Sequence, residues 1–208
     1  AENGRYKGGF HFGDWLFYRP NDDNDGRAAV TSKELIAQSF FTYSVEIIKN
    51  AAKALNNKSD FEYYSVLHKV AKKAFTEEFI TPSGRLISET QTAYVLALQF
   101  NLFPESLKAQ AVDRLVANIE SYDTHLTTGF LGTPFLCHVL SQNGRSDIAV
   151  KLLLQKSYPS WLYPVTQGAT TIWERWDGLK PNGDTQTPSM NSYNHYAYGA
   201  IGEWMYTY

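Results

Sequence analysis

The sequence predicts an all-α protein. Several stretches carry apolar residues at helical spacing, and each is bounded by residues that typically start or stop helices. No stretch of any length alternates apolar and polar residues as a half-buried strand would, and no fixed-period repeat is present. At 208 residues, the chain has the length of one domain with a sizeable core.

Two long helices are predicted first. One covers about 31–55 and opens with TSKE, a capping box in which Thr31 is the N-cap and Glu34 reaches back to it. The pair Asn56-Asn57 ends this helix, and Ser59 is the expected N-cap of the next. Both stretches keep apolar residues near helical spacing, so both are expected to bury one face.

Five shorter helices complete a set of about seven. Their predicted ranges are about 90–100, 104–119, 133–142, 147–155 and 193–206, and 156–192 is predicted to be irregular. Tight turns alternate with longer connections, which predicts helical hairpins with the long connections gathered at one end. Functional side chains are expected in those long connections, because a rigid scaffold positions them there. They cover 1–30, 81–90, 121–132 and 156–192.

Composition excludes several classes of function. A formal net charge of −2 and a pI near 6.2 give no electrostatic basis for binding nucleic acid or an anionic membrane surface. The apolar runs are short, so no membrane span is expected. Cys137 is the single cysteine, which excludes an internal disulfide, and with His138 it lies in an apolar stretch and is expected in the core. The histidines lack metal-binding spacing, so no metal site is expected.

The acidic stretch NDDNDG at 21–26 invites a calcium interpretation. Oxygen-bearing residues at alternate positions followed by glycine resemble the start of an EF-hand loop. The loop's closing Glu would fall at position 32, where the chain has Ser32. A solvated turn before the first long helix is therefore the prediction.

The first long connection contains FHFGDWLFY, with Asp14 between Gly13 and Trp15 and aromatic residues, among them Phe10, just before. Aromatic faces beside a carboxylate suit carbohydrate, since the rings stack on C–H faces and the carboxylate accepts hydroxyl hydrogens. The structural alternative is that Asp14 caps a turn and Trp15 belongs to the core. The sequence alone leaves both open.

The stretch GATTIWERWDG at 168–178 places Glu174 between Trp173 and Trp176. A carboxylate shielded from water by such rings can act as a general base on a water molecule. The alternative is an ion pair of Arg175 with Glu174 or Asp177 that holds the loop closed.

The last predicted helix, MNSYNHYAYGAIGEWMY, carries Asn194 and His195 at its start, where a connection delivers polar groups to the functional end. A satisfied core histidine is the alternative for His195.

Taken together, five motifs resemble the catalytic domain of bacterial α-L-rhamnosidases, glycoside hydrolase family 78. They are FGDWL (12–16), TQTAYVLAL (90–98), GFLGTPFLCHVL (129–140), GATTIWERWDG (168–178) and MNSYNHYAYGAIGEWMY (190–206). The resemblance covers nearly the whole chain in order. It implies an (α/α)6 barrel and hydrolysis of terminal α-L-rhamnosides in a rhamnose-containing glycoside or polysaccharide, with inversion and without a cofactor.

The resemblance also implies roles for individual residues. Glu174 matches the general base, Asp14 a carboxylate that holds rhamnose hydroxyls, and His195 a residue lining the sugar pocket. Trp173 and Trp176 are expected to form walls of that pocket, and Phe10 and Trp15 are expected to bind the substrate with them.

One departure bears on activity. The family's general acid is a Glu in an acidic motif upstream of GDW, and no such motif precedes Phe10 here. About seven helices are also fewer than six hairpins require. We therefore expect 1–208 to be a C-terminal, partial barrel that is inactive without the remainder of its own catalytic domain. A periplasmic or secreted location would fit some relatives, but the sequence does not determine it.

Three other interpretations compete with this one. A different (α/α)6 glycosidase would share the scaffold, because such folds host several chemistries. A non-catalytic carbohydrate-binding helical domain would keep the pocket without the acid. A protein-binding helical array is disfavoured by irregular helix lengths and by aromatics concentrated in the connections.

Overall fold

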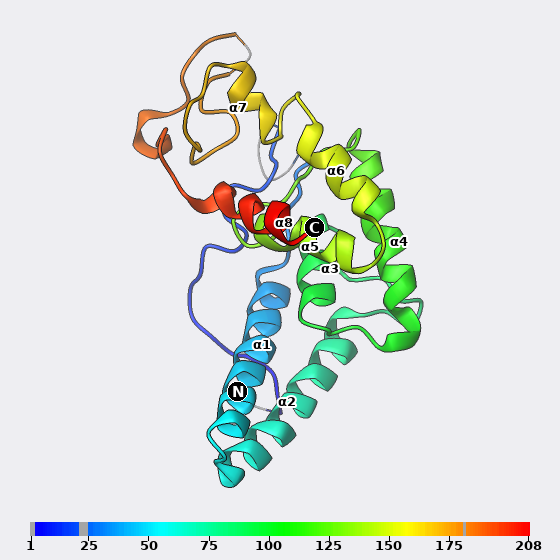
Figure 1. The fold of residues 1–208 in the computed structure, drawn as a ribbon. Coiled ribbons are helices and arrows are strands. Elements are labelled where there is room, and N and C mark those ends of the chain that lie inside the picture. The colour runs from blue at the N-terminus through cyan, green and yellow to red at the C-terminus, as the bar shows by residue number, and fades with distance from the viewer. Residues whose placement is uncertain (1–2, 21–24, 181) are drawn as a thin grey trace.

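The computed structural model describes residues 3–20, 25–180 and 182–208 (Figure 1). Within these ranges the chain is all-α, with two isolated β-bridges and no strand, which confirms the predicted class. The solvated turn predicted at 21–26 falls mostly on 21–24, outside the described residues. The helices are α1 (Lys33–Ala54), α2 (Lys58–Phe79), α3 (Gln91–Gln99), α4 (Glu105–Ser121), α5 (Thr133–Gln142), α6 (Ser146–Leu154), α7 (Leu162–Thr166) and α8 (Ile201–Thr207).

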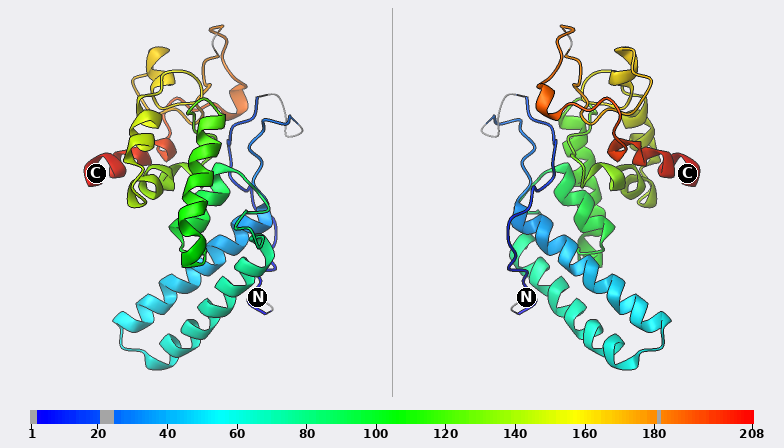
Figure 2. Two further views of the ribbon diagram at one scale, coloured as in Figure 1. Left: turned by 90° about the vertical axis from the view of Figure 1, so that its right-hand side faces the viewer. Right: turned by 90° about the vertical axis from the view of Figure 1, so that its left-hand side faces the viewer.

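Consecutive helices pack as hairpins. α1 packs on α2, α3 on α4 and α5 on α6, while α3 also contacts α5, and α8 returns to α5. The connections within hairpins are short and those between hairpins are long, as the sequence predicted. In both views of Figure 2 the α1–α2 hairpin projects away from the rest of the molecule. The connection before α1 starts beside the α1–α2 hairpin and runs along α1, and its later part meets the connection after α6 beyond the opposite end of α1 (Figure 1).

Helix α3 lies at the centre of the core. Every residue from Gln91 to Leu98 is buried, although only one face of a surface helix would be. Two of these residues, Gln91 and Thr92, are polar, and the amide of Gln91 is satisfied on both sides. Its Nε2 donates to the carbonyl of His125 (3.0 Å), and its Oε1 accepts from the N–H of Thr127 (2.8 Å). The core helix thereby fixes the 122–132 connection, which reaches the site described below.

Two predicted N-caps are wrong by one or two positions. Ser32, not Thr31, caps α1, because the buried Thr31 hydroxyl is hydrogen-bonded to Thr90 (2.6 Å). Ser32 Oγ accepts from the Leu35 N–H (3.2 Å) and donates to Glu34, which does not reach back to Thr31.

The second correction concerns α2, where Asn57 replaces Ser59 as the N-cap. Asn57 Oδ1 accepts from the Asp60 N–H (3.2 Å), and Asn57 Nδ2 donates to the Asp60 carboxylate (2.8 Å). An asparagine therefore performs the capping that was assigned to a serine.

The C-terminal helix also starts later than predicted. The backbone at 192–195 pairs with 172–174 instead of with its own helix, as in the hydrogen bond from His195 N–H to the Ile172 carbonyl (2.8 Å). Helical structure begins as a 3₁₀ turn at Ala197–Ala200 and continues as α8. The segment 156–192, predicted as irregular, contains the short helix α7 and a 3₁₀ turn at Pro188–Met190.

Cys137 lies in the core, as predicted, and burial raises the pKa of its thiol from 9.0 to about 12. Since each pKa unit is a factor of ten in ionisation, the native protein at pH 8 should hold about 10³-fold less thiolate than a free thiol. We expect iodoacetamide to label Cys137 only after unfolding, measured by mass spectrometry of its peptide. Native labelling as fast as that of the unfolded chain would contradict this burial.

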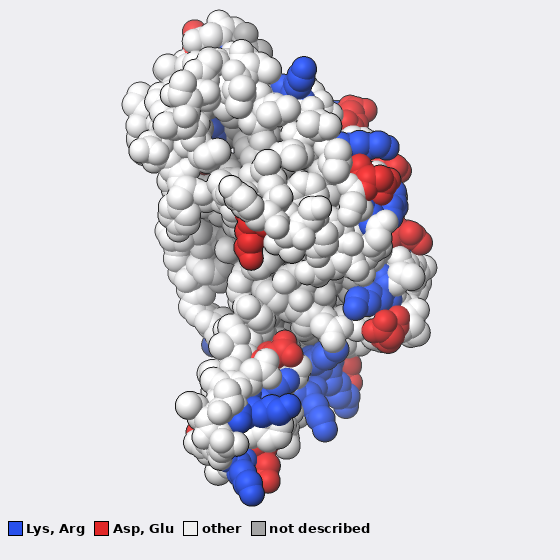
Figure 3. All heavy atoms as spheres, in the orientation of Figure 1, with Lys and Arg blue, Asp and Glu red and all other residues white. Residues whose placement is uncertain are grey.

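Charged side chains are unevenly distributed over the surface. On the face in Figure 3, Lys, Arg, Asp and Glu gather over the α1–α2 hairpin and along the edge formed by α4 and α6. The part formed by the segment between α7 and α8 shows mostly uncharged side chains on this face. No described helix combines the length and the hydropathy that crossing a bilayer requires.

Candidate active site

The main cavity, of about 740 Å³, lies where the first long connection meets the one after α6. The N-terminal side contributes residues 12–17, 19 and 20 and the stretch 30–34 at the start of α1, and the C-terminal side contributes Tyr158 and residues between 175 and 190. Aromatic rings from both sides line the cavity: Phe12, Trp15, Phe17, Tyr158 and Trp176. A cavity with aromatic walls and a few polar groups is typical of a small-molecule site.

Asp14 lies at the edge of this cavity with its carboxylate almost fully buried. Both oxygens accept hydrogen bonds from the protein. The donors to Oδ2 are the Thr92 hydroxyl and the Gly129 N–H (2.8 Å), and those to Oδ1 are the N–H groups of Leu131 (2.7 Å) and Gly132 (3.2 Å).

This environment changes the interpretation of Asp14. Burial raises the pKa of its carboxyl above the ordinary value, although the hydrogen bonds act in the opposite direction. Because four protein donors already occupy its oxygens, the geometry does not fit the expectation of a carboxylate holding rhamnose hydroxyls. It matches the alternative of a turn-capping residue, here one that also ties the first connection to α3 and to the start of α5. Trp15, by contrast, is 38% exposed and does not belong to the core.

The chain passes very close to itself beside Asp14. The Phe130 N–H donates to the Trp15 carbonyl (2.9 Å), and the Tyr18 N–H donates to that of Thr127 (2.9 Å). A Cβ atom at Gly129 would lie 2.2 Å from the Trp15 carbonyl oxygen, so only glycine fits there. Asp14 and Gly129 together hold Trp15 on the cavity wall.

Glu174 lies in a short two-chain pairing. Its N–H donates to the Ser192 carbonyl (2.8 Å), and its Oε2 accepts from the Ser192 N–H (2.9 Å). The side chain is half-buried, and it does not line the main cavity, although Arg175 and Trp176, which follow it in sequence, do. The carboxylate is therefore fixed by one backbone donor, with Oε1 free of any described protein partner.

The ion pair considered from the sequence forms with Asp177. Arg175 Nε lies 2.6 Å from Asp177 Oδ1, Arg175 Nη2 lies 3.3 Å from Oδ2, and Gln186 donates to the same carboxylate. Glu174 takes no part in this pair. Glu174 and the Arg175–Asp177 ion pair thus occupy neighbouring positions of one loop, and the ion pair leaves the Glu174 carboxylate without a cation.

The two tryptophans beside Glu174 are buried but face different neighbours. Trp176 stacks on Tyr198 with ring centroids 3.8 Å apart and lines the main cavity. Trp173 packs edge-on against Tyr193 (5.1 Å) and does not line that cavity. The expectation that both form walls of the pocket therefore fits Trp176 in this structure.

Similarity to known proteins identifies the family of this chain. Residues 2–208 match the model of the bacterial alpha-L-rhamnosidase 6 hairpin glycosidase domain. The chain belongs to this rhamnosidase family. The family's six-hairpin architecture agrees with the consecutive hairpins seen here and confirms a partial (α/α)6 barrel.

Individual rhamnosidases show how much of the family's proteins this chain represents. It is 46% identical over 195 residues to an alpha-L-rhamnosidase of Streptomyces avermitilis and 44% identical over 197 residues to one of Formosa agariphila. Each match covers 94% of this chain but only 18% and 21% of the relative. The chain thus spans about a fifth of these curated relatives.

Solved rhamnosidases have the same fold in this region. The crystal structure of the Streptomyces avermitilis enzyme complexed with L-rhamnose superposes with a TM-score of 0.91 at 42% identity, over 100% of this chain and 19% of that one. Native α-L-rhamnosidase from Aspergillus terreus gives a TM-score of 0.92 at 36% identity, over 99% of this chain and 24% of that one.

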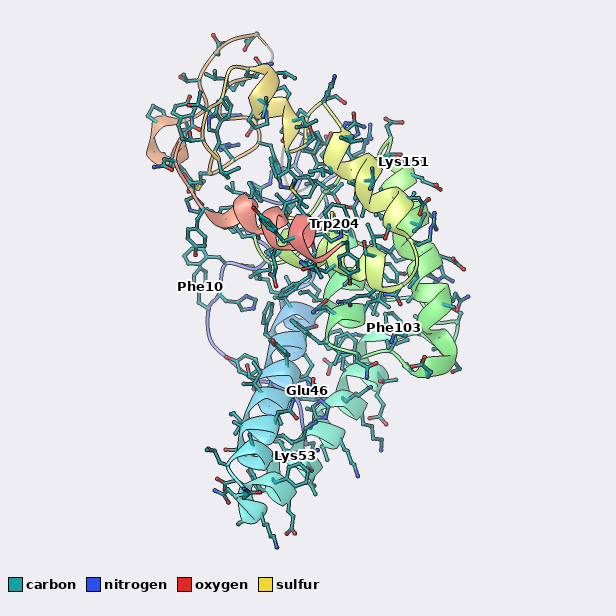
Figure 4. All side chains as sticks on the ribbon, viewed as in Figure 1. Phe10, Glu46, Lys53, Phe103, Lys151 and Trp204 are labelled. Carbon is teal, nitrogen blue, oxygen red and sulfur yellow. The ribbon has the colours of Figure 1, made fainter. Side chains whose placement is uncertain are left out.

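The remaining site residues of this rhamnosidase-family chain lie apart from the main cavity. The His195 ring stacks on Phe130 (5.2 Å) and is half-buried. Phe10, labelled in Figure 4, lies on the connection before α1 and is 82% exposed. The Lys33 ammonium lies 5.4 Å from its ring centre, and Phe10 lines a separate cavity of about 310 Å³. The structure therefore does not bring Phe10 to the main cavity.

Sequence reasoning missed Tyr198, which connects the parts of this site. Its buried ring contacts Trp176 and Phe130, its hydroxyl donates to the Leu16 carbonyl (3.4 Å), and its own carbonyl accepts from Trp161 Nε1 (3.0 Å). Its position between small residues of a tyrosine-rich stretch was a weak signal, since nothing local shows which tyrosine turns inward. Among the described residues, no three His, Cys, Asp or Glu side chains converge as metal ligands.

Proposed function

We propose that this chain supplies part of the catalytic domain of an α-L-rhamnosidase and hydrolyses terminal α-L-rhamnosides with inversion. Glu174 carries the proposal: its carboxylate is fixed beside an aromatic cavity and left unpaired by Arg175, in a member of the rhamnosidase family. A carboxylate that one donor orients and no cation neutralises can accept a proton from water.

In the proposed reaction Glu174 is the general base. The Ser192 N–H holds Oε2, so Oε1 is free to take the proton of a water molecule as its oxygen attacks the anomeric carbon. The bond from that carbon to the leaving oxygen breaks, and an acid in the rest of the catalytic domain protonates this oxygen. Attack from the face opposite to the leaving group gives inversion, for which two separated carboxyl groups suffice.

The other predicted site residues have supporting parts in this proposal. Asp14 acts as a positioning residue, because it orders the connection that presents Trp15, rather than as a ligand of the sugar. Trp15 and Trp176 offer ring faces to the substrate. Trp173 and His195 hold the paired segments around Glu174, and Phe10 would approach substrate only from the separate cavity.

The partner we propose is the remainder of the same catalytic domain. Large apolar side chains are exposed on the projecting α1–α2 hairpin, where a further hairpin of the barrel would cover them. They are Ile47, Ile48, Leu55, Tyr63, Val66 and Val70. In this proposal, domain 1–208 supplies the general base, and the remainder of the barrel supplies the general acid.

The test uses the full-length polypeptide that carries this chain. We expect it to hydrolyse an aryl α-L-rhamnoside in preference to aryl glucosides, mannosides and fucosides. Proton NMR in the first minutes should show the β-anomer of rhamnose, since inversion converts an α-linkage to a β-product. Early α-rhamnose would contradict inversion, preference for another sugar would indicate a different glycosidase, and binding without hydrolysis a carbohydrate-binding relative.

A further inference from the structure

Arg175, Asp177 and Gln186 form a hydrogen-bonded group on the wall of the main cavity, called here the polar bracket. The Arg175 guanidinium holds the Asp177 carboxylate with two nitrogens, and Gln186 Nε2 donates to the same carboxylate. All three residues line the cavity, whereas the proposed base does not. The hydrolysis described above gives none of them a role.

We propose that the polar bracket binds hydroxyl groups of the substrate's sugar and so contributes to sugar specificity. This inference rests on the proposed function. Arg175 and Gln186 are the groups that contact the hydroxyls, and Asp177 is a positioning residue that acts through both.

The bracket is ordered before any ligand arrives. The side chains of Arg175 and Asp177 are only 20% and 18% exposed, and the two-point contact fixes the plane of the guanidinium. Within the described chain, Arg175 Nη1 and Gln186 Oε1 have no hydrogen-bond partner, although the other polar atoms of both side chains do. The bracket therefore offers a hydroxyl one donor, Arg175 Nη1, and one acceptor, Gln186 Oε1. Both are already ordered, so binding would cost little further conformational entropy.

Charge balance in the cavity favours a neutral ligand over an anion. Among the described lining residues, three are basic (Arg19, Lys33 and Arg175) and three are acidic (Asp14, Glu34 and Asp177). Within the bracket the charge of Arg175 is neutralised by Asp177, so no unpaired cation is left there for a phosphate or a carboxylate. A polyhydroxylated sugar fits both the neutral bracket and the aromatic rings of Trp15 and Trp176 on the same cavity wall.

The bracket depends on a turn that returns to the cavity. The bridge between Leu179 and Thr185 closes this turn, and the Gln186 N–H donates to the Gly178 carbonyl (3.1 Å). Gly178 has no room for a side chain, because a Cβ there would lie 2.9 Å from Trp173 and from Asn191. The turn thereby brings Gln186 back to Asp177, nine positions earlier in the chain.

The test compares two variants of the full-length polypeptide with a matched control. Arg175→Lys keeps the charge but loses the two-point fork, and Gln186→Leu removes the amide at similar volume. The control is Arg145→Lys, since Arg145 and Asp147 form a surface pair with the same spacing, outside the main cavity. KM and kcat are measured with an aryl α-L-rhamnoside and a rhamnosyl disaccharide, and sugar affinity is followed by tryptophan fluorescence.

We expect Arg175→Lys to raise KM about 10–100-fold with little change in kcat. The lost hydrogen bond involves a charged group and is made equally in the ground state and the transition state, so its loss weakens binding and leaves the chemical step unchanged. If KM rises for both substrates, the bound hydroxyls belong to rhamnose. If KM rises for the disaccharide alone, they belong to the leaving sugar. Gln186→Leu should shift KM in the same direction, which keeps the test valid if Arg175→Lys does not fold.

KM and sugar affinity that stay within about twofold of wild type in both folded variants, as in the Arg145→Lys control, would overturn the inference. The two proposals fail separately. A wild type that binds L-rhamnose without hydrolysing it, while the bracket variants bind more weakly, would reject the hydrolysis and retain the bracket. A wild type that hydrolyses rhamnosides, together with bracket variants of unchanged KM, would retain the proposed hydrolysis and reject the role of the bracket.

Discussion

Replacement of Glu174 by glutamine in the full-length polypeptide is expected to lower kcat for an aryl α-L-rhamnoside by about 10²–10⁴-fold, because an amide cannot accept the proton of the attacking water. The fold should survive, since glutamine retains an oxygen that can accept from the Ser192 N–H, the one side-chain contact recorded for Glu174 among the described residues. KM should change little, because glutamine keeps the size of the side chain and its contact with Ser192, and the proton transfer that it loses belongs to the chemical step. Steady-state kinetics and circular dichroism measure these effects.

The matched control for this variant is Glu203→Gln. Glu203 is exposed on α8, and its side chain makes no hydrogen bond with the described residues, so its replacement should leave kcat unchanged. Retained activity in Glu174→Gln would remove Glu174 as the base. Equal losses in both variants would point to an effect of the lost charge and not of the catalytic group.

Replacement of Asp14 should have the largest effect on stability. In Asp14→Asn one carboxylate oxygen becomes an NH2 group, and in either orientation it faces at least one backbone N–H that needs an acceptor. A buried unsatisfied donor costs about 1–3 kcal/mol, so we expect Asp14→Asn to lower the free energy of unfolding by at least about 2 kcal/mol. Asp14→Ala should lower it further, because it leaves three backbone N–H groups without an acceptor. Denaturant unfolding followed by near-ultraviolet circular dichroism measures it, with the exposed Asp113→Asn on α4 as the control.

The pKa of Asp14 adds a pH dependence to this comparison. Because burial raises it in the folded state, the unfolded chain releases this proton at a lower pH than the folded one. The stability advantage of wild type over Asp14→Asn should therefore be fullest below the ordinary pKa of 3.8, and decline as pH rises through the folded value. An advantage that grows with pH in this window would mean that the hydrogen bonds outweigh burial.

Much of the fold could be predicted because its signals are local. The apolar period and the proline at position 134 placed α5 correctly, and Asn143 with Gly144 marked its end. The helix predicted over 90–100 likewise begins correctly, since Thr90 is the N-cap of α3 and its hydroxyl accepts from the Ala93 N–H. Alternation of short and long connections then indicated hairpins, and the motifs indicated the rhamnosidase family that the comparisons confirmed.

The errors arose where a distant contact competed with a local one. Thr31 had the local features of an N-cap, but Thr90 takes its hydroxyl, and Ser32 caps the helix instead. The stretch from Tyr193 had helical composition, but its backbone pairs with 172–174, which delays the helix to Ala197. Local periodicity carries no information about either competitor.

The sequence by itself determined the all-α class, the order of the hairpins and the motif that holds Glu174, because neighbouring residues encode all three. Only the tertiary structure decided which groups bind the Asp14 carboxylate, which residue pairs with Arg175 and which rings face the main cavity. The donors to Asp14 lie 78 to 118 positions further along the chain, and the partner of Glu174 lies 18 positions away. A carboxylate is a ligand, a cap or a base according to the groups that folding brings to it, and those groups are not its neighbours in sequence.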